Sequence, residues 1–504
     1  MSLAIALSRS QDGMDALGIC VETHLSNGLP SFTIVGLPET AVRESRERVR
    51  SALINSGFEF PQRRITVNLA PGGIPKEGTR FDLAIAIGIL AASHQIPLQA
   101  LAHSEFVAEL ALDGALRAVG MTLAAALAAR TAKHALFVAD ADADEAALIA
   151  DAEVHAALSL REVCLHLQNQ VRLPRRAMPK RDGERSQLPD LVDVVGQSRA
   201  RRALEIAASG AHNLLLIGPP GTGKTMLATR LPGLLPALSE EQALSVAAIH
   251  SVAGQPSRLD EWRSPPYRAP HHSASAVALV GGGRGPRPGE ISLAHLGVLF
   301  MDELPEFERR ALEALREPLE SGHITVARAA RSVRYPASFL LIAAMNPCPC
   351  GFHGDGRNQC ICTPERITAY RARISGPLSE RIDLHVEVPR QTAELVSVHR
   401  RDEENSALVS SRVRQLRARQ VERQEKLNGE LSSAELARCC AIAPNARHLL
   451  AHALDRLGLS ARGYHKVLKL ALTIADMAGA DIIVEDHVAE AISYRVLDRR
   501  PIAR

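Results

Sequence analysis

One segment of eight residues combines the residue types that bind nucleotide phosphates. It follows an apolar run at 214–217 and consists of Gly218, Pro219, Pro220, Gly221, Thr222, Gly223, Lys224 and Thr225. Glycines let backbone N–H groups close around phosphate oxygens, and the helix expected from Met226 to Arg230 adds the favourable charge of its N-terminus. We therefore expect Lys224 to contact the β and γ phosphates of ATP and the Thr225 hydroxyl to bind Mg²⁺.

A pair of acidic residues could supply the hydrolytic half of the same site. A predicted strand at 298–300 is followed by Asp302 and Glu303. Asp302 would complete the Mg²⁺ shell, and Glu303 would be the base that activates the attacking water. A third apolar run, at 339–343, leads to Asn346, whose amide can orient that water or contact the γ phosphate. The matched context favours an ATPase over the alternative, three buried strands with polar ends.

Phosphoryl transfer also needs positive charge near the γ phosphate. Arg381, in Ser-Glu-Arg-Ile-Asp, and Arg462, in Ser-Ala-Arg-Gly, are the candidates for this role. Spacing alone does not distinguish either of them from a surface arginine.

Four of the eight cysteines lie close together in the sequence. One residue separates Cys348 from Cys350 and Cys360 from Cys362, and nine residues lie between the pairs. Four thiolates could hold a structural Zn²⁺ in a closed tetrahedral site, although a one-residue gap is shorter than the usual spacing. His353 is a substitute ligand, and reduced thiols without a metal are the alternative interpretation.

Length and composition bound the organisation that positions these residues. The 504 residues suggest about three domains, and 46% hydrophobic with 23% charged residues is typical of a globular protein. A net charge of +3 does not identify a nucleic-acid binder, and 3% aromatic residues argue against base stacking as a main binding mode. Neither a secretory peptide nor an apolar stretch of membrane-spanning length is present, so we expect a cytoplasmic protein and no membrane partner.

The pattern along the chain predicts four segments. Residues 1–170 form an α/β domain, because strands expected at 32–35, 65–69, 106–108 and 135–138 alternate with helices expected at 39–56 and 121–130. Residues 171–189, with three prolines and many charges, are expected to be a linker. Residues 190–390 carry the nucleotide motifs, and residues 391–504 are expected to be helical.

Two longer runs resemble the magnesium-chelatase type of AAA+ ATPase. They are Pro-Gly-Glu-Ile-Ser-Leu-Ala-His at 288–295 with Gly-Val-Leu-Phe-Met-Asp-Glu at 297–303, and Ala-Met-Asn-Pro-Cys-Pro-Cys-Gly at 344–351. With Ile-Val-Gly-Leu-Pro at 34–38, nearly the whole chain resembles the ComM/YifB family of bacterial competence proteins. The resemblance implies a Lon-protease-like α/β N-terminal domain, an AAA+ P-loop core with a parallel sheet, and a C-terminal α-helical lid.

The resemblance also implies an activity and residue roles. A homohexameric ring would hydrolyse ATP to drive branch migration of DNA during natural transformation, on forked, branched or three-strand recombination intermediates. By the same resemblance, Asn346 matches the first sensor, Arg381 an arginine finger that acts across a subunit boundary, and Arg462 the second sensor.

Two segments match the pore elements of this clade. A hairpin is expected at 324–335, where Arg328, Arg331 and Arg334 would grip DNA phosphates. Their spacing of three does not suit the two-residue alternation of a strand, so a tip is expected within this run. Residues 269–283 match a helix insertion, and surface loops are the alternative for both segments.

The N-terminal domain departs from the Lon-like pattern where catalysis would occur. Arg80 stands in place of the nucleophilic serine, and Leu123 stands in place of its lysine partner. Neither residue can perform the replaced function, which leaves Thr79 as the neighbouring hydroxyl. We expect a non-proteolytic scaffold or a DNA-binding platform.

Three other functions compete with a DNA motor. A chelatase-type motor subunit that remodels a partner protein shares the same core, and only the N-terminal domain and the cysteine segment favour the DNA motor, by resemblance. The missing serine and lysine oppose an ATP-dependent protease. The signature loop of a transcription activator is not found in the sequence.

Overall fold

Two compact units make up the protein. The computed structural model describes residues 2–37, 39–74, 76–178, 188–255, 261–283, 286–328, 331–356, 359–391, 404–457 and 460–495. The first unit comprises Met1–Gly183 and Ala243–Trp262, and the second comprises Glu184–Gln242 and Arg263–Arg504. Each unit has a hydrophobic core of its own.

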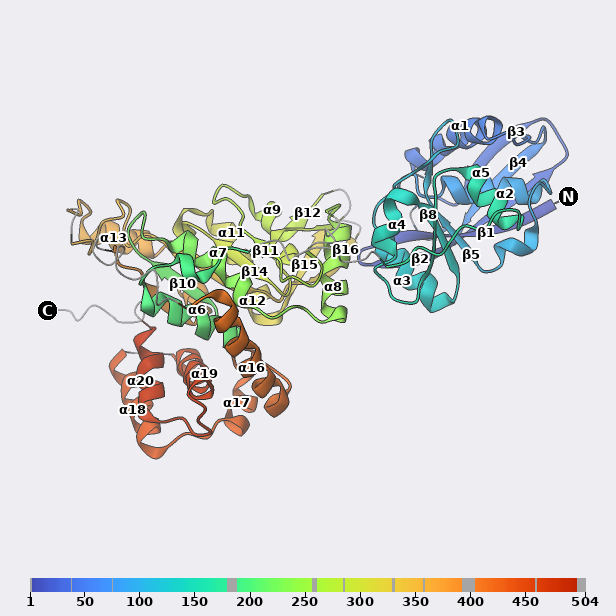
Figure 1. The fold of residues 1–504 in the computed structure, drawn as a ribbon. Coiled ribbons are helices and arrows are strands. Elements are labelled where there is room, and N and C mark those ends of the chain that lie inside the picture. Colours follow the sequence, from blue (N-terminus) through green and yellow to red (C-terminus); the bar gives the residue numbers. More distant parts are fainter. Residues whose placement is uncertain are drawn as a thin grey trace. The chain divides into compact units, whose positions relative to one another are not determined.

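A seven-stranded mixed sheet forms the centre of the first unit, with the strand order β3-β4-β2-β1-β5-β8-β9 (Figure 1). Strands β1 and β2 pair antiparallel, whereas β5, β8 and β9 run parallel. Every residue of helix α2 is buried. The elements are β1 Ser2–Asp12, β2 Asp15–Ser26, β3 Ser31–Val35, α1 Thr40–Asn55, β4 Arg64–Ala70, α2 Asp82–Ala92, β5 Ser104–Val107, β6 Glu109–Leu110, β7 Leu116–Arg117, α3 Thr122–Ala132, β8 Ala135–Ala139, α4 Asp140–Ala146, β9 Glu153–Ala157 and α5 Leu160–Leu167.

The first part of the predicted linker is bonded to this unit. Arg175 forms a β-bridge with His155, and the N–H of Arg176 donates to the carbonyl of Val154 at 2.7 Å. This part of the segment is therefore ordered against β9. Residues 179–187 lie outside the described residues.

A parallel five-stranded sheet with the order β11-β14-β17-β10-β18 forms the centre of the second unit. Strands β10, β14 and β17 are buried along their whole length, as expected of a parallel sheet covered on both faces. The elements are α6 Ser198–Gly210, β10 Leu214–Ile217, α7 Lys224–Leu234, β11 Tyr267–Arg268, α9 Ala276–Val280, β12 Gly281–Gly282, β13 Arg287–Pro288, α10 Glu290–Leu293, β14 Val298–Met301, α11 Arg309–Ala314, α12 Pro318–Ser321, β15 His323–Arg328, β16 Arg331–Pro336, β17 Leu340–Met345, α13 Pro364–Arg371, α14 Gly376–Ser379 and β18 Leu384–Glu387. Helix α8, Glu240–Val252, is divided between the units, because its residues from Ala243 onward belong to the first.

The strand order explains where a ligand can bind. Strand β10 is the first of the five in the sequence, yet it lies between β17 and β18, which come last. The order therefore reverses beside β10, and open α/β sheets bind ligands at such a switch point, outside the carboxyl ends of the strands. The segment after Ile217 is the glycine-rich one.

The predicted hairpin is present. Strands β15 and β16 pair antiparallel with Arg328 opposite Arg331 and Thr325 opposite Arg334. The tip therefore falls between Arg328 and Arg331, which confirms the prediction made from the arginine spacing. The side chains of Arg328 and Arg331 lie outside the described part of the structure, and Arg334 is exposed.

The C-terminal region is helical, as predicted. Asn405, Ser432 and Ser460 each accept a backbone N–H from the first turn of the helix that follows, which fixes where those helices begin. Apolar residues of these helices share one core with the five-stranded sheet. The helices are α16 Ser406–Gln424, α17 Ser433–Cys439, α18 Pro444–Leu457, α19 Ala461–Met477 and α20 Glu485–Ser493.

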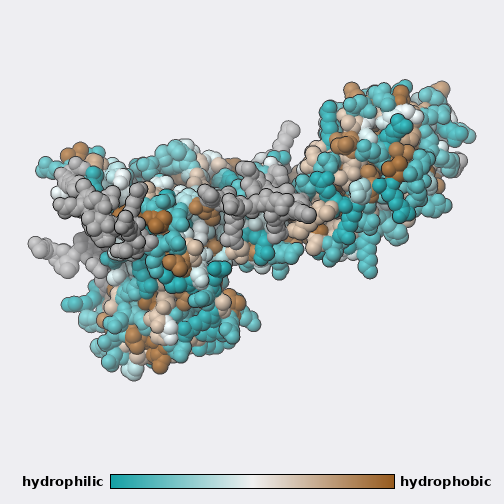
Figure 2. All heavy atoms as spheres, in the orientation of Figure 1, coloured by the Kyte–Doolittle hydropathy of each residue, from teal (hydrophilic) through white to brown (hydrophobic). Residues whose placement is uncertain are grey.

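The surface is predominantly hydrophilic on the face that Figure 2 shows, and hydrophobic residues are scattered over it. Among the described helices, none combines the length and the apolar character that crossing a membrane requires.

Candidate functional site

The phosphate loop joins β10 to α7 at the switch point of the sheet. Gly223 has a φ of +87° and caps α7, and Gly221 has a φ of +74°, both in the left-handed region that favours glycine. A Cβ at Gly218 would lie 2.3 Å from the carbonyl oxygen of Val388, so only glycine fits there. The loop therefore ends with backbone N–H groups at the start of a helix, where phosphate is favoured.

Lys224 lies buried inside this loop. Its ammonium donates to the carbonyls of Gly218 at 2.6 Å and Pro219 at 2.9 Å, and to the Asn346 Oδ1 at 3.3 Å. Burial lowers the pKa of Lys224, while the nearby Asp302 and Glu303 oppose that shift. The hydrogen bond from Lys224 to the Asn346 amide connects the phosphate loop to the end of β17. Both side chains can therefore contact the same phosphate group.

The hydroxyl and carboxylate predicted to bind Mg²⁺ are in contact. The Thr225 hydroxyl donates to the Asp302 Oδ2 at 2.8 Å. Thr225 follows β10, and Asp302 follows β14, so both lie at the carboxyl edge of the sheet. Oxygen ligands of this kind suit Mg²⁺, which takes one or two protein groups together with phosphate oxygens and water.

Glu303 adopts an unusual backbone conformation next to this pair. Its φ is +53°, and its N–H donates to the Asp302 Oδ1 at 3.0 Å. A left-handed conformation costs a non-glycine residue roughly 1–3 kcal/mol and occurs preferentially at functional sites. The two neighbouring carboxylates have different partners, Thr225 for Asp302 and His272 for Glu303.

His272 is a contact of the site that the sequence reasoning missed. Its Nδ1 lies 3.2 Å from the Glu303 Oε2, and its ring lies 4.1 Å from the ring of His271 between centroids. The sequence places both histidines just after β11, at the same edge of the sheet. The two adjacent histidines can be seen in the sequence. Their proximity to Glu303 cannot, because it arises only from the pairing of β11 with β14.

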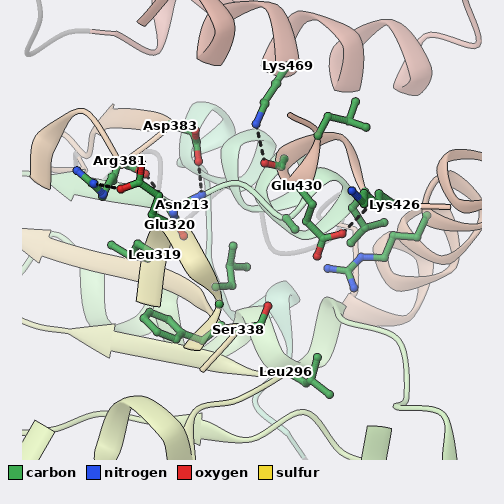
Figure 3. Close-up of a pocket in the computed structure, with 18 of the residues that line it drawn as sticks. Asn213, Leu296, Leu319, Glu320, Ser338, Arg381, Asp383, Lys426, Glu430 and Lys469 are labelled. Carbon is green, nitrogen blue, oxygen red and sulfur yellow. Dashed lines mark hydrogen bonds and ion pairs between the residues drawn. The ribbon is translucent and has the colours of Figure 1, made fainter. Parts of the chain in front are cut away.

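The two candidate arginines lie together at the other edge of the sheet. The guanidinium of Arg381 bonds to one carboxylate oxygen of Glu320, and that of Arg462 bonds to the other oxygen at 3.0 Å (Figure 3 shows the Arg381 contact). Arg381 precedes β18, and Glu320 and Arg462 lie in α12 and α19. The structure therefore brings the arginines together and separates them from the phosphate loop of the same chain.

The four cysteines form a compact cluster. Sulfur–sulfur distances are 3.4 Å for Cys348–Cys350, 3.7 Å for Cys348–Cys360 and 3.6 Å for Cys350–Cys360, and all four sulfurs, including that of Cys362, lie within 4.8 Å of one another. A tetrahedral site with Zn–S bonds of about 2.3 Å has edges of about 3.8 Å, so the cluster fits Zn²⁺.

The chain around the cluster favours the thiolate of Cys350 and touches the nucleotide site. Backbone N–H groups of Phe352 and Ile361 lower the pKa of Cys350 to about 6, and the thiolate is the form that binds metal. Gly351 has a φ of +86°, and a Cβ there would lie 2.8 Å from the Cδ of Pro220. The cysteine loop therefore packs directly on the phosphate loop.

Purified protein should contain about one zinc per chain, because four thiolates complete a closed site. Cys348→Ser should lose the zinc, whereas Cys439→Ser, outside the cluster, should keep it. Elemental analysis of protein prepared in metal-free buffer measures both. Zinc-free protein with four freely titratable thiols at the cluster would contradict this prediction.

Arg80 and Leu123, which the resemblance places where a Lon-like protease has its serine and lysine, are buried. Burial lowers the pKa of Arg80, while Asp142 opposes the shift, and Leu123 belongs to the buried face of α3. The Thr79 hydroxyl donates to the carboxylate of Glu109. Arg80 and Leu123 are therefore packed inside the first unit, and the neighbouring Thr79 hydroxyl is bonded to a carboxylate.

Comparison with known proteins identifies the family of the chain. Three family models match: "Subunit ChlI of Mg-chelatase" at residues 21–142, "Magnesium chelatase, subunit ChlI" at 190–396 and "Magnesium chelatase, subunit ChlI C-terminal" at 403–495. The parallel sheet, its glycine loop and the acid pair thus define an AAA+ ATPase of the magnesium-chelatase type.

Close relatives match over the whole length. The chain is 50% identical to "Uncharacterized protein YifB" of Escherichia coli over 99% of this chain and 98% of the relative. It is 48% identical to "Competence protein ComM" of Haemophilus influenzae over 99% of this chain and 98% of the relative. The chain belongs to the YifB/ComM family. A more distant relative, "Magnesium-chelatase 38 kDa subunit" of Rhodobacter capsulatus, is 27% identical over 61% of this chain and 88% of the relative.

Proposed function

We propose that this protein is an ATP-driven ring motor on DNA, a branch-migration helicase that promotes recombination during natural transformation. Lys224 and the loop N–H groups bind the phosphates, Thr225 and Asp302 hold Mg²⁺, and Glu303 activates the attacking water. The name of the relative from Haemophilus influenzae, a competence protein, supports the process in which the motor works.

The observation that carries the proposal is the separation of the two halves of the ATP site. Lys224, Asp302 and Asn346 follow strands and lie at the carboxyl edge of the five-stranded sheet, whereas Arg381 precedes β18 and lies at its amino edge. A strand of four residues is about 13 Å long. Arg381 can therefore serve as a finger only for the ATP of another chain, which supports a ring of identical subunits, and a homohexamer fits the family.

The arginine hairpin supports a polymer of phosphates as the substrate. In the strand register, Arg328 pairs with Arg331 at the tip of β15 and β16, and exposed Arg334 lies three residues further along β16. Arginine pairs well with phosphate oxygens, and phosphate contacts position DNA without reading its sequence.

A chelatase-type motor that remodels a partner protein is the second candidate. The family models at residues 21–142, 190–396 and 403–495 carry chelatase names, and the core of the site is compatible with that function. The DNA motor is favoured because the competence protein is more similar, 48% over 99% of the chain against 27% over 61%. A protease is disfavoured, because buried Arg80 and Leu123 occupy the places of the serine and lysine.

Replacing Arg328, Arg331 and Arg334 with alanine should abolish junction processing but spare basal ATP hydrolysis. The reason is that these residues hold DNA phosphates and do not touch nucleotide. DNA binding by the wild type should weaken steeply with salt, with a slope that falls by about 0.9 for each phosphate contact removed from duplex DNA. Dissociation of Holliday junctions and forks, measured beside the ATPase rate on one preparation, tests the proposal.

A matched control replaces three arginines elsewhere on the second unit, Arg199, Arg316 and Arg438, and should retain junction dissociation. Branch migration at the wild-type rate by the hairpin variant would rule out the pore function. That result would leave the chelatase-type motor as the better candidate.

A further inference from the structure

A large cavity lies along the amino edge of the five-stranded sheet. Its volume is about 1310 Å³, and residues that precede all five strands line it: Pro265, Asn213, Leu296, Ser338 and Asp383. The C-terminal helices close the other side with Lys426, Glu430 and Lys469 (Figure 3). The cavity thus lies between the five-stranded sheet and the C-terminal helical region. It is at the edge of the sheet opposite to the phosphate loop.

Glu320 stands between two cations in this cavity. One carboxylate oxygen accepts from the Nη2 of Arg381, and the other accepts from the Nη2 of Arg462 at 3.0 Å. These two bonds lower the pKa of Glu320, with the Arg381 hydrogen bond as the largest cause. Guanidinium groups from the core and from α19 therefore converge on a single anion.

The Nε of Arg381 is the nitrogen of its guanidinium that donates no hydrogen bond to a described residue. Its Nη1 donates to the carbonyl of Pro377 at 2.8 Å, and its Nη2 donates to Glu320. The Nε is buried and has no acceptor among the described residues, and the side chain is only 11% exposed. A buried N–H without an acceptor is costly, and an anion with more oxygens than a carboxylate would satisfy it. A phosphate group has such oxygens and suits guanidinium geometry equally well.

We propose that Glu320 is an internal anionic latch: its carboxylate occupies the position between Arg381 and Arg462 that the γ phosphate of ATP takes when a second copy of the chain brings its nucleotide to this edge. The proposal rests on the proposed function, in which Arg381 acts across a subunit boundary. It adds that Arg462 contacts the same γ phosphate as Arg381. It also adds that Glu320 occupies the space between the two arginines until the neighbour's ATP arrives.

The position of Glu320 allows such a displacement. Its side chain is 57% exposed, and it lies near the end of the short helix α12, two residues before Gly322 at a φ of +70°. Water reaches the Glu320 carboxylate and weakens both of its ion pairs, so a phosphate with greater charge can replace the carboxylate. Before ATP arrives, Glu320 holds a fraction of the arginine pairs closed, and the apparent affinity for ATP falls in proportion to the fraction that remains open.

The test is steady-state ATP hydrolysis by the full-length protein with Glu320→Gln. Removing the charge should lower the KM for ATP by roughly two- to thirtyfold, the range expected of two ion pairs to a solvent-exposed carboxylate, with kcat unchanged. The chain concentration that gives half-maximal activity should fall as well, because the free arginine pair binds the neighbour's nucleotide more readily. Thermal unfolding of the variant checks that it is folded.

Glu317→Gln is the matched control. Glu317 lies just before α12, carries the same charge and hydrogen-bonds Thr325 at 3.5 Å rather than an arginine. Its KM should equal that of the wild type. An unchanged KM in Glu320→Gln, an equal fall in both variants, or a lower kcat in Glu320→Gln alone would overturn the latch; the last result would make Glu320 a positioning residue for the arginines.

The failure of the latch and that of the proposed function are distinguishable. If Arg381→Ala hydrolyses ATP normally, the finger across the boundary is wrong and the latch falls with it. If Arg381→Ala is inactive while Glu320→Gln keeps the wild-type KM, the finger stands and only the latch is wrong.

Discussion

Glu303→Gln should bind ATP with wild-type affinity and hydrolyse it about 10²- to 10⁴-fold more slowly, the range that general bases contribute. The amide keeps the size of the side chain but cannot accept a proton from the attacking water. Lys224, Thr225 and Asp302 remain in place, so nucleotide and Mg²⁺ still bind. Release of inorganic phosphate and binding of a fluorescent ATP analogue measure the two effects on one preparation.

Two further variants define what the result means. Lys224→Ala should lose nucleotide binding itself, because the buried ammonium is the cation inside the phosphate loop. Glu306→Gln is the control, since Glu306 pairs with Arg373 at 2.7 Å on the surface and should turn over normally. Near-normal turnover by Glu303→Gln would assign the base to another group.

Arg381→Ala should reduce ATP turnover by about 10³-fold or more, the effect of losing an arginine finger. A mixture of Arg381→Ala and Lys224→Ala chains should regain part of the activity. At some boundaries of mixed assemblies, an intact phosphate loop from one chain meets an intact arginine from the other. Turnover measured against the mixing ratio should pass through a maximum near equal amounts.

The control for the finger is Arg419→Ala. Arg419 lies in the helical region and pairs with Asp481 at 2.7 Å, so its removal should leave turnover unchanged. Arg381→Ala with normal turnover, or a mixture no more active than its components, would refute action across the boundary.

The geometry of the nucleotide site could be predicted from the sequence because each motif is a short run of adjacent residues. A glycine loop after a buried strand fixes the start of α7, and a short apolar run fixes each of β14 and β17 before Asp302 and Asn346. Strand β17 pairs parallel with both β10 and β14, which places the three strand ends at one edge. The contact of Lys224 with Asn346 follows from pattern and sheet topology together.

Other elements were missed because their signals were not local. Strands β1 and β2 were not predicted. Burial alternates along both strands, but residues 3–7 of β1 are all apolar and buried Ser8 and Ser10 are polar, so the sequence of β1 hides that alternation. Helix α2 has no polar face, because it is buried on every side, so it shows no helical periodicity. The pairing of Arg381 with Arg462 joins residues far apart in the chain through Glu320, and no spacing rule could predict it.

Because Gly351 packs against Pro220, oxidation of the cysteine cluster should also inactivate ATP hydrolysis. Two residues before Cys348 stands Asn346, which bonds Lys224, so one short segment carries a sulfur of the cluster and a contact of the phosphate loop. Oxidation that pulls the cysteines out of place must shift both. ATP hydrolysis should therefore decay in step with free thiol content during storage in air, and fresh reductant with zinc should restore the two together. A residue larger than glycine at position 351 would bring on the same loss without any oxidant.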